Sequence, residues 1–340
     1  MKSSPRNLPL RAGLLLSGLV LLVALFGPSL APDDPLKVYR SQRINGVTYG
    51  GPPLRAIPPF TDPRFPLGVD YVSRDVLSRL LWAVRPTLLL CLTIVTARVL
   101  AGLLIGALAG WYGRRTIWLV DSLSVLSGSI PLLLLATGMM IAWDRGPVGS
   151  LLVFTVALSL TGWINTATIV QSRIQTTLHA PFIESARAIG QRRWGIFWRH
   201  VLPQVWPALP MVIASELSAV TLVVAELGYL GFYIGGAFTY TDNIGDSPTP
   251  DVIKVAAGQP ELGQMLSDFF GQYNRTPWVN IWAGLVVVMM LSGFTLLSEG
   301  LRRQLDVTRP RTARWWRRDA AATDGAKGLK DKGKGLKDKG

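Results

Sequence analysis

Six long apolar runs constrain this 340-residue chain more than any other feature. They occupy residues 12–29, 86–111, 117–142, 149–172, 207–232 and 280–299. Each has about the length that an α-helix needs to cross a bilayer, which is roughly 20 residues. Backbone groups in lipid must be paired within the segment, so these runs should be helices, whereas a barrel would show alternating segments of about ten residues. We therefore expect an all-α, polytopic membrane protein with about six transmembrane helices.

The distribution of basic residues predicts the orientation of these spans. With the N-terminus inside, both termini and the segments 112–116 and 173–206 lie in the cytoplasm, and these pieces hold 23 of the 35 Lys and Arg residues. Such an excess in short cytoplasmic segments is typical of inner-membrane proteins. The net charge of +14 thus indicates membrane orientation and contact with membrane lipid, with no nucleic acid partner. We expect a multi-pass protein of the cell inner (plasma) membrane.

Changes in composition divide the chain into four regions. Residues 30–66 hold eight prolines, which indicates an extended loop. The regions are a cytoplasmic N-terminus with an uncleaved transmembrane anchor (1–30), an extracytoplasmic loop (31–85), a transmembrane domain that includes the cytoplasmic loop 173–206 (86–306), and a basic tail predicted to be disordered (307–340).

A helix is also predicted to begin within the extracytoplasmic loop. From Asp70 onward, apolar residues such as Val72, Val76 and Leu80 recur at helical spacing, and Asp70 or Ser73 would cap the helix. The sequence favours a helix that lies on the membrane surface.

Few residues suit catalysis or metal binding. The single cysteine, Cys91, lies in an apolar run, and both histidines, His179 and His200, lie in the cytoplasmic loop. No nucleophile and base stand together within the spans, and no Gly-x-x-x-x-Gly-Lys-Ser/Thr phosphate loop occurs. The sequence therefore predicts no catalytic residue, no metal, no cofactor and no ATPase site. A membrane enzyme is one of the functional classes considered, and these observations argue against it.

Ionisable residues within the spans are functional candidates because charge is costly in lipid. Arg98, near the middle of its run, would face a wet cavity or form a structural pair with a carboxylate such as Glu216, and both interpretations stay open. Glu226, toward the outer end of its run, would be an outer gate or a structural anchor. A secondary transporter could use such groups, but Glu216 and Glu226 lie about 80° apart on a helix and no internal repeat is evident. A requirement for ATP rather than an ion gradient would separate these classes.

The cytoplasmic loop contains a short amphipathic helix. Pro181 suits its first turn, and Phe182, Ile183, Ala186 and Ile189 are predicted to share one face. The small residues Ser185, Ala186 and Ala188 form a patch, and Gly190 offers a stop. Such a helix could lie on the membrane or fill a groove on a partner protein.

Spacing within this loop resembles a known motif. Glu184-Ser185-Ala186, three residues, Gly190, nine residues and then His200-Val201-Leu202-Pro203 are similar to the EAA loop of bacterial ABC-importer permeases. That loop has Glu-Ala-Ala, Gly and Ile-x-Leu-Pro at the same spacing, so Ser185 and His200 depart from it. The resemblance implies a cytoplasmic helix that docks into a groove on a separate ATPase subunit.

The residues implied for this coupling role form two sets. The motif positions are Glu184, Ser185, Ala186, Gly190, Leu202 and Pro203, and the apolar face of the helix is Phe182, Ile183 and Ile189.

Other segments resemble the C-type permease subunit of dipeptide, oligopeptide and nickel importers. They are 66–79, 109–113, 226–231, 277–278 and 299–306. Three departures are Ser73 in place of Gly, a shorter run after Glu226, and a longer insertion around 236–262.

This resemblance implies a permease subunit that forms half of a translocation pathway. Its expected partners are a homologous permease, two ABC ATPase subunits and an extracytoplasmic solute-binding protein. The expected substrate is a peptide, with nickel or another small solute as the alternative.

Overall fold

The computed structural model describes most of the chain. The described residues are 7–39, 42–44, 47–49, 57–129, 131–143, 151–234, 237–242, 252–257, 259–267 and 275–305. The predicted disordered tail, 307–340, lies outside them. By contacts the chain divides into two units, Met1–Leu301 and Arg302–Gly340, and the last described residues of the second unit belong to a helix that ends at Leu305.

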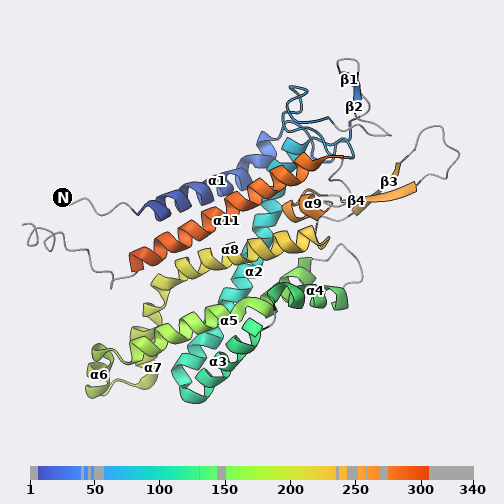
Figure 1. Ribbon diagram of the computed structural model, residues 1–340. Helices are drawn as coiled ribbons and strands as arrows, with labels where there is room; N and C mark the ends of the chain where they lie inside the picture. Colours follow the sequence, from blue (N-terminus) through green and yellow to red (C-terminus); the bar gives the residue numbers. More distant parts are fainter. Residues whose placement is uncertain are drawn as a thin grey trace, which may run out of the picture. The chain divides into compact units, whose positions relative to one another are not determined.

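Long helices dominate the first unit (Figure 1). They are α1 (Leu8–Leu30), α2 (Val76–Tyr112), α5 (Leu151–Leu178), α8 (Leu209–Tyr229) and α11 (Pro277–Leu305). Among the described residues, four helical stretches are long and apolar enough to cross a membrane: Leu8–Leu30, Val76–Tyr112, Arg193–Tyr229 and Pro277–Leu305. These four stretches and the 28-residue α5 cover five of the six predicted runs.

The remaining run, 117–142, forms two helices rather than the single span predicted. They are α3 (Arg114–Ser129) and α4 (Leu132–Trp143), and Pro131 lies between them. Proline has no backbone N–H to donate to the preceding turn, and its ring clashes with that turn, so one continuous helix is disfavoured here. Both helices pack against α5.

The predicted surface helix near Asp70 is wrong. Residues before α2 form a tight loop, in which Asp70 accepts hydrogen bonds from the backbone N–H of Val72 and Arg74 (3.0 and 2.8 Å) and Ser73 adopts φ +65°. Asp75 is the N-cap and accepts from Ser78 N–H at 2.8 Å. The helical spacing therefore belongs to the first turns of α2, which are buried. Short aspartates that bond their own downstream amides favour loops and caps over helix interiors.

Helix α2 occupies the centre of the unit and contacts α1, α3, α5, α8 and the short α9 (Leu262–Ser267). Its most extensive packing is with α5, where Gly102, Gly106 and Gly110 share one face. A Cβ on Gly106 would lie 2.4 Å from the carbonyl oxygen of Ala167, so only glycine permits this packing. These glycines, spaced by four, therefore admit α5 close to the backbone of α2.

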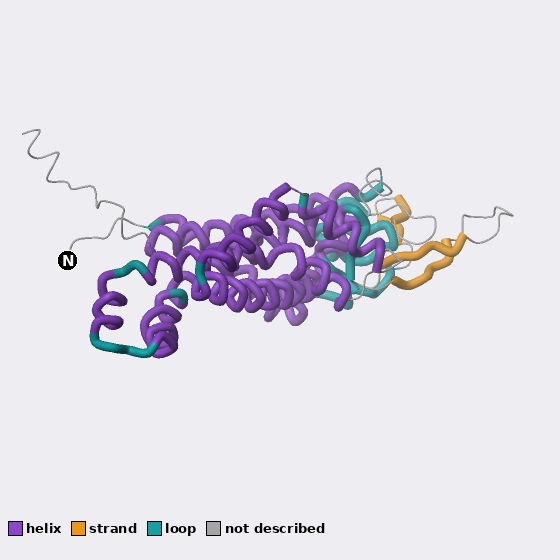
Figure 2. Tube along the Cα trace, turned by 90° about the horizontal axis from the view of Figure 1, so that it is seen from below, coloured by secondary structure: helices purple, strands orange, loops and turns teal. Residues whose placement is uncertain are grey.

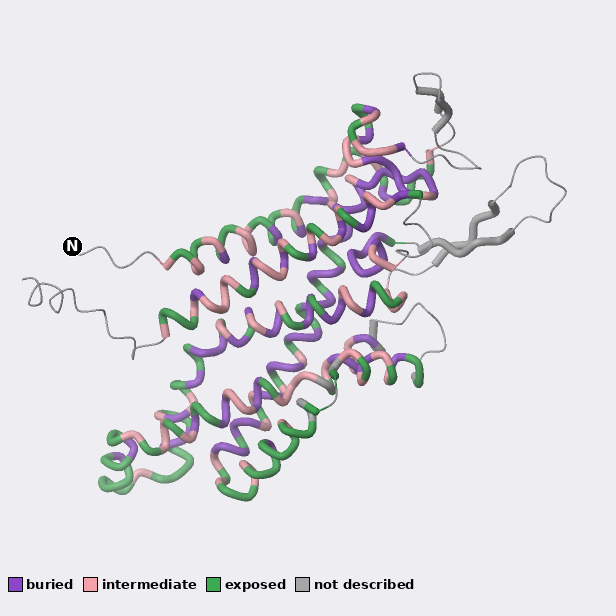
Figure 3. The backbone as a smooth tube through the Cα atoms, viewed as in Figure 1, coloured by how far each residue is buried: buried purple, intermediate pink, exposed green. Residues whose placement is uncertain are grey.

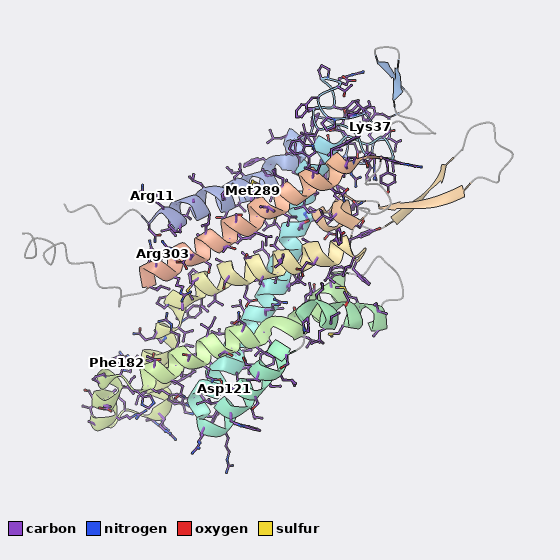
Figure 4. The ribbon with its side chains drawn as sticks, viewed as in Figure 1. Arg11, Lys37, Asp121, Phe182, Met289 and Arg303 are labelled. Carbon is purple, nitrogen blue, oxygen red and sulfur yellow. The ribbon has the colours of Figure 1, made fainter. Side chains whose placement is uncertain are left out.

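Two antiparallel hairpins complete the described structure. They are β1 (Gln42–Ile44) with β2 (Val47–Tyr49), and β3 (Ala237–Asp242) with β4 (Val252–Ala257), paired from Ala237↔Ala257 to Asp242↔Val252. The second hairpin lies within the predicted insertion. Figure 2 shows both hairpins at the end of the helices opposite the short helix α6 (Pro181–Ala188). In Figure 4, Arg11 in α1 lies toward the α6 end and Lys37 toward the hairpin end.

Candidate functional site

Helix α6 forms the predicted docking helix and ends as the sequence requires. After Ala188 the chain turns at Gly190, whose φ is +77°. The N–H of Gly190 donates to Arg187 O at 3.0 Å, and the N–H of Gln191 donates to Ala186 O at 3.2 Å. These paired bonds form the Schellman arrangement, which needs a left-handed residue that glycine adopts without strain. The prediction that Gly190 stops this helix is confirmed.

The other end of α6 also follows local rules. Pro181 occupies the first helical position, where no N–H donor is needed, and Glu184 lies in the first turn. A carboxylate there interacts favourably with the positive end of the helix dipole. Ser185 is exposed and its hydroxyl donates back to Pro181 O at 3.2 Å.

The apolar residues Phe182, Ile183, Ala186 and Ile189 lie within about 120° of one another around the helix axis, but only part of this face is buried. Ile183 and Ala186 are buried, at 0% and 6% exposure, in a cluster with residues of α2, α5 and the segment after α6. Phe182 and Ile189 are 46% and 76% exposed, and Figure 4 shows Phe182 at the edge of the molecule. The inward half anchors the helix to its own chain, and the outward half is free to contact a partner. Ala186 therefore packs against this chain rather than facing outward.

Leu202 and Pro203 lie where the helix changes pitch. From Arg193 the chain runs through α7 (Arg193–Ile196), a π-helix η1 (Phe197–Val201) and two 3-10 turns, η2 (Leu202–Gln204) and η3 (Trp206–Ala208), into α8. Pro203 cannot donate within the helix, and such π and 3-10 segments re-pair the backbone around it. The segment that holds α6 is thus joined to α8 by one helical stretch, in which Val201 is fully buried.

Aromatic rings attach this stretch to the end of α2. Phe197 packs against Trp111 with ring centroids 5.0 Å apart and against Trp194 at 5.8 Å. The end of α2 and the start of the stretch therefore form one packed unit.

The mid-membrane charge Arg98 pairs with Glu216. Arg98 Nη1 lies 3.2 Å from Glu216 Oε2, and its Nε donates to Leu158 O at 2.8 Å. Asn165 Nδ2 donates to the other oxygen of Glu216 at 3.3 Å. A Cβ at Gly162 would lie 2.1 Å from Arg98 Cζ, so a glycine makes room for the guanidinium. The pair ties α2, α5 and α8 together.

Glu226 is half-buried in the last turn of α8, which ends at Tyr229. Its backbone carbonyl accepts from Leu230 N–H at 3.1 Å, and Gly231 then turns the chain with φ +92°. Two residues later, Gly228 packs so closely against Gly263 of α9 that a Cβ on Gly228 would lie 2.3 Å from Gly263 Cα. Glu226 therefore lies beside the contact between α8 and α9.

Sequence reasoning missed a buried polar cluster at the hairpin end of the helices. Arg74 Nε lies 2.7 Å from Asp70 Oδ2, and Arg79 Nη2 donates to Gln264 Oε1 at 2.6 Å. Thr87 Oγ1 accepts from Leu262 N–H at 3.1 Å, so α2 holds both ends of the first turn of α9. Most residues of this cluster belong to the segments 66–79 and 260–266. No local sequence pattern shows that these two segments are in contact.

Glu261, at the start of α9, belongs to the same cluster. Its Oε2 accepts from Ile234 N–H at 2.8 Å, and the side chain is almost fully buried. Burial raises the pKa of this carboxyl to about 7, while the hydrogen bond from Ile234 opposes the shift.

Comparison with known proteins gives consistent matches. Residues 102–308 match the family described as "Binding-protein-dependent transport system inner membrane component". The chain is 27% identical over 296 residues to a di/tripeptide transport system permease protein of Pseudomonas aeruginosa, with 86% of each chain covered. It is 22% identical over 294 residues to an oligopeptide transport system permease protein of Bacillus subtilis (86% of this chain, 84% of the relative).

Two further proteins are similar to this chain. A glutathione transport system permease protein of Pectobacterium atrosepticum is 26% identical over 240 residues, 71% of each chain. Among solved structures, an inward-facing MetNI methionine ABC transporter matches with TM-score 0.45 and 18% identity, over 68% of this chain and 98% of that one.

The family match covers more than half of the chain and includes α6, α8 and α11. The relatives are permease components rather than enzymes. The chain therefore belongs to the binding-protein-dependent transport system inner membrane components, and it is a permease subunit of an ABC importer.

Proposed function

We propose that this subunit forms half of the translocation pathway of a peptide importer, and that the outward half of α6 couples it to a separate ATPase subunit. The observation that carries this is the division of the apolar face of α6 into an exposed and a buried part. Phe182 and Ile189 are exposed at one edge of this face, and Ala186 and Ile183 are buried toward the other edge. A helix built in this way can bind a partner's groove and remain fixed to its own chain.

The path of coupling follows from the contacts of α6. Its buried face shares a cluster with Val201, Val205 and Leu209, which belong to the stretch leading into α8. The far end of α8 packs on α9 through Gly228 and Gly263. Displacement of α6 would therefore be transmitted along α8 to its contact with α9, at the opposite end of the helices.

Peptides are the proposed substrate class because relatives that cover most of the chain are named for dipeptides, tripeptides and oligopeptides. Nickel or another small solute is the alternative. Family membership implies an ATPase and a substrate-binding protein as partners. We propose two copies of the ATPase and one homologous permease as partners. Membership of this family argues against the secondary transporter and the membrane enzyme that were considered from the sequence.

We propose that Arg98 is an anchor and not a gate, because it joins α2 to α5 through Leu158 O and to α8 through Glu216. Removing one member of a buried pair leaves an uncompensated charge and typically costs about 3–5 kcal/mol. Arg98→Met should therefore prevent accumulation in membranes, and the double variant with Glu216→Gln should recover it. For Glu226, the variant Glu226→Gln separates the two roles: loss of accumulation indicates an anchor, and accumulation without uptake indicates a gate.

The coupling assignment is tested with Phe182→Ser combined with Ile189→Ser. The matched control is Ala188→Ser, which is also exposed on α6 but lies about 120° around the helix from Phe182. We expect the double variant to insert normally, to lose the co-purifying ATPase subunit and to lose uptake of a labelled dipeptide into proteoliposomes containing ATP. The control should retain both. Retention of the ATPase by the double variant would show that this face does not dock.

A further inference from the structure

A cavity of about 330 Å³ lies beside the docking helix. It is lined by Trp111, Leu178, Arg187, Gln191, Arg193 and Ile196. These residues come from the ends of α2, α5 and α6 and from the start of the stretch leading to α8. The cavity therefore lies where four segments converge at the cytoplasmic end of the spans.

The lining of the cavity combines cationic, polar and apolar side chains. Arg187 and Arg193 are exposed, and neither takes part in an ion pair between described residues. Gln191 Oε1 lies 3.1 Å from His200 Nε2, which leaves the amide NH2 of Gln191 to donate elsewhere. Two guanidinium groups and an amide donor suit a phosphate, whose oxygens accept charge-assisted hydrogen bonds. Trp111, Leu178 and Ile196 supply an apolar wall.

The depth of the cavity matches the headgroup region of a bilayer. Trp194, Trp198 and Trp206 are 53%, 62% and 58% exposed along the stretch that borders it, and Tyr112, at the end of α2, is 65% exposed. Exposed Trp and Tyr side chains concentrate at the membrane–water interface. A phosphate in this cavity would thus lie level with the phosphates of the cytoplasmic leaflet.

The cavity is also turned away from the face proposed to meet the ATPase. Arg187 lies about 140° around α6 from Phe182 and about 160° from Ile189, at 100° per residue. An acidic side chain of the ATPase bound against Phe182 and Ile189 would therefore approach the opposite side of the helix.

We propose that this cavity binds the phosphate headgroup of an anionic phospholipid of the cytoplasmic leaflet. Arg187 and Arg193 hold the phosphate, Gln191 donates to it, and the acyl chains lie against the exposed apolar surface of the spans. Basic pockets between transmembrane helices on the cytoplasmic side are suited to such headgroups. The bound lipid connects α6 to the ends of α2 and α5. It therefore stabilises α6 on the side opposite the proposed ATPase contact.

The test uses the full importer complex in nanodiscs of phosphatidylcholine mixed with phosphatidylglycerol. Native mass spectrometry of the released complex gives the ratio of retained phosphatidylglycerol to phosphatidylcholine. Each arginine that donates charge-assisted hydrogen bonds to the phosphate contributes about tenfold or more in affinity, so Arg187→Gln with Arg193→Gln should lower the ratio about 100-fold. The matched control is Arg192→Gln with Arg199→Gln, which removes the same charge from exposed positions of the same segment that do not line the cavity. The control removes only the general attraction of two arginines to an anionic surface, so it should lower the ratio by no more than about 25-fold.

Three results would overturn the proposal. An equal loss in the control would show a diffuse basic surface. Displacement of the lipid by soluble glycerol phosphate, with equal affinity, would show a site for free phosphate. Loss of the ATPase subunit by the Arg187/Arg193 variant in phosphatidylcholine alone would show that the cavity takes a carboxylate of the ATPase. Because lipid retention is measured without transport, failure here leaves the proposed coupling role untouched.

Discussion

The two ends of the helices of this permease are built in contrasting ways (Figure 3). At the α6 end, arginines and apolar side chains are exposed, and the backbone is organised by neighbouring residues such as Pro181 and Gly190. At the hairpin end, Asp70, Arg74 and Arg79 are buried together, and Arg79 also bonds Gln264 from a distant part of the chain. The first end has the properties of a surface made for partners, and the second those of an internal fastening. Substitutions at the two ends should therefore fail in different ways.

The largest expected effect is at the internal fastening. Asp70→Asn removes the charge that faces two buried arginines, which typically costs about 3–5 kcal/mol when one partner of a buried pair is lost. We expect low accumulation in membranes and a lower thermal unfolding midpoint in detergent. The control, Lys37→Gln, breaks an exposed pair with Asp33 and should change stability by less than about 1 kcal/mol. Equal stability of the two variants would erase the contrast between the ends.

A pH dependence is expected from Glu261. Its pKa is raised from 4.5 to about 7 in the folded protein, so the folded state holds its proton more tightly than the unfolded state does. Stability is then full at low pH and is lost as pH rises from about 4.5 through about 7, with a total on the order of 3 kcal/mol. Thermal unfolding of the full chain between about pH 5 and about pH 8 measures it. Glu261→Gln should flatten this dependence, and an unchanged slope in that variant would assign the effect to other groups.

A smaller effect is expected where α8 meets α9. In Gly228→Ala the new methyl would lie 2.3 Å from Gly263 Cα, so the helices must separate, and overpacking of this kind costs about 1–3 kcal/mol. The control is Gly195→Ala, whose Cβ would meet nothing within 4 Å. Proteolysis at the segment after α8 should become faster only in the first variant. Equal protection in both variants would contradict the close packing.

The smallest effect on stability, with the sharpest effect on assembly, is expected at Gly190. Its φ of +77° costs a β-branched residue about 1–2 kcal/mol, yet a Cβ there would meet no atom within 4 Å. Gly190→Val should thus insert and accumulate, but with a misdirected α6 that no longer retains the ATPase. Co-purification measures this directly. A variant that is lost from membranes would show that the loop is needed for folding as well.

The same contrast explains what the sequence could predict. Turn and cap chemistry is local, so the stop at Gly190 and the Pro181 start of α6 were readable from a few residues. The direction of each apolar side chain was not, because Ile183 and Ala186 are buried by residues of α2 and of the stretch after the loop. The pairing of Arg98 with Glu216 could be suggested from the sequence because both charged residues interrupt apolar runs. The contact of Arg79 with Gln264, 185 positions apart, depends on packing that no local pattern encodes.

The surface helix predicted at Asp70 failed for a related reason. Apolar spacing identifies helical faces, but Asp70 bonds the amides that follow it and holds them in a loop, so the helix begins only after Asp75. The break at Pro131 was visible in the sequence, yet an apolar run of the right length outweighed a single proline in the prediction.

The irregular pitch between Arg193 and Leu209 has a consequence for torsion. Residues in π geometry advance less than the roughly 100° per residue of an α-helix and residues in 3-10 geometry advance more, so η1 and the turns η2 and η3 twist the stretch in opposite senses. Exchange of a few hydrogen bonds between the π, 3-10 and α patterns would rotate the docking end about its own axis while α8 stays in place. If α6 docks as proposed, this stretch would pass force from the ATPase to α8 as rotation as well as displacement.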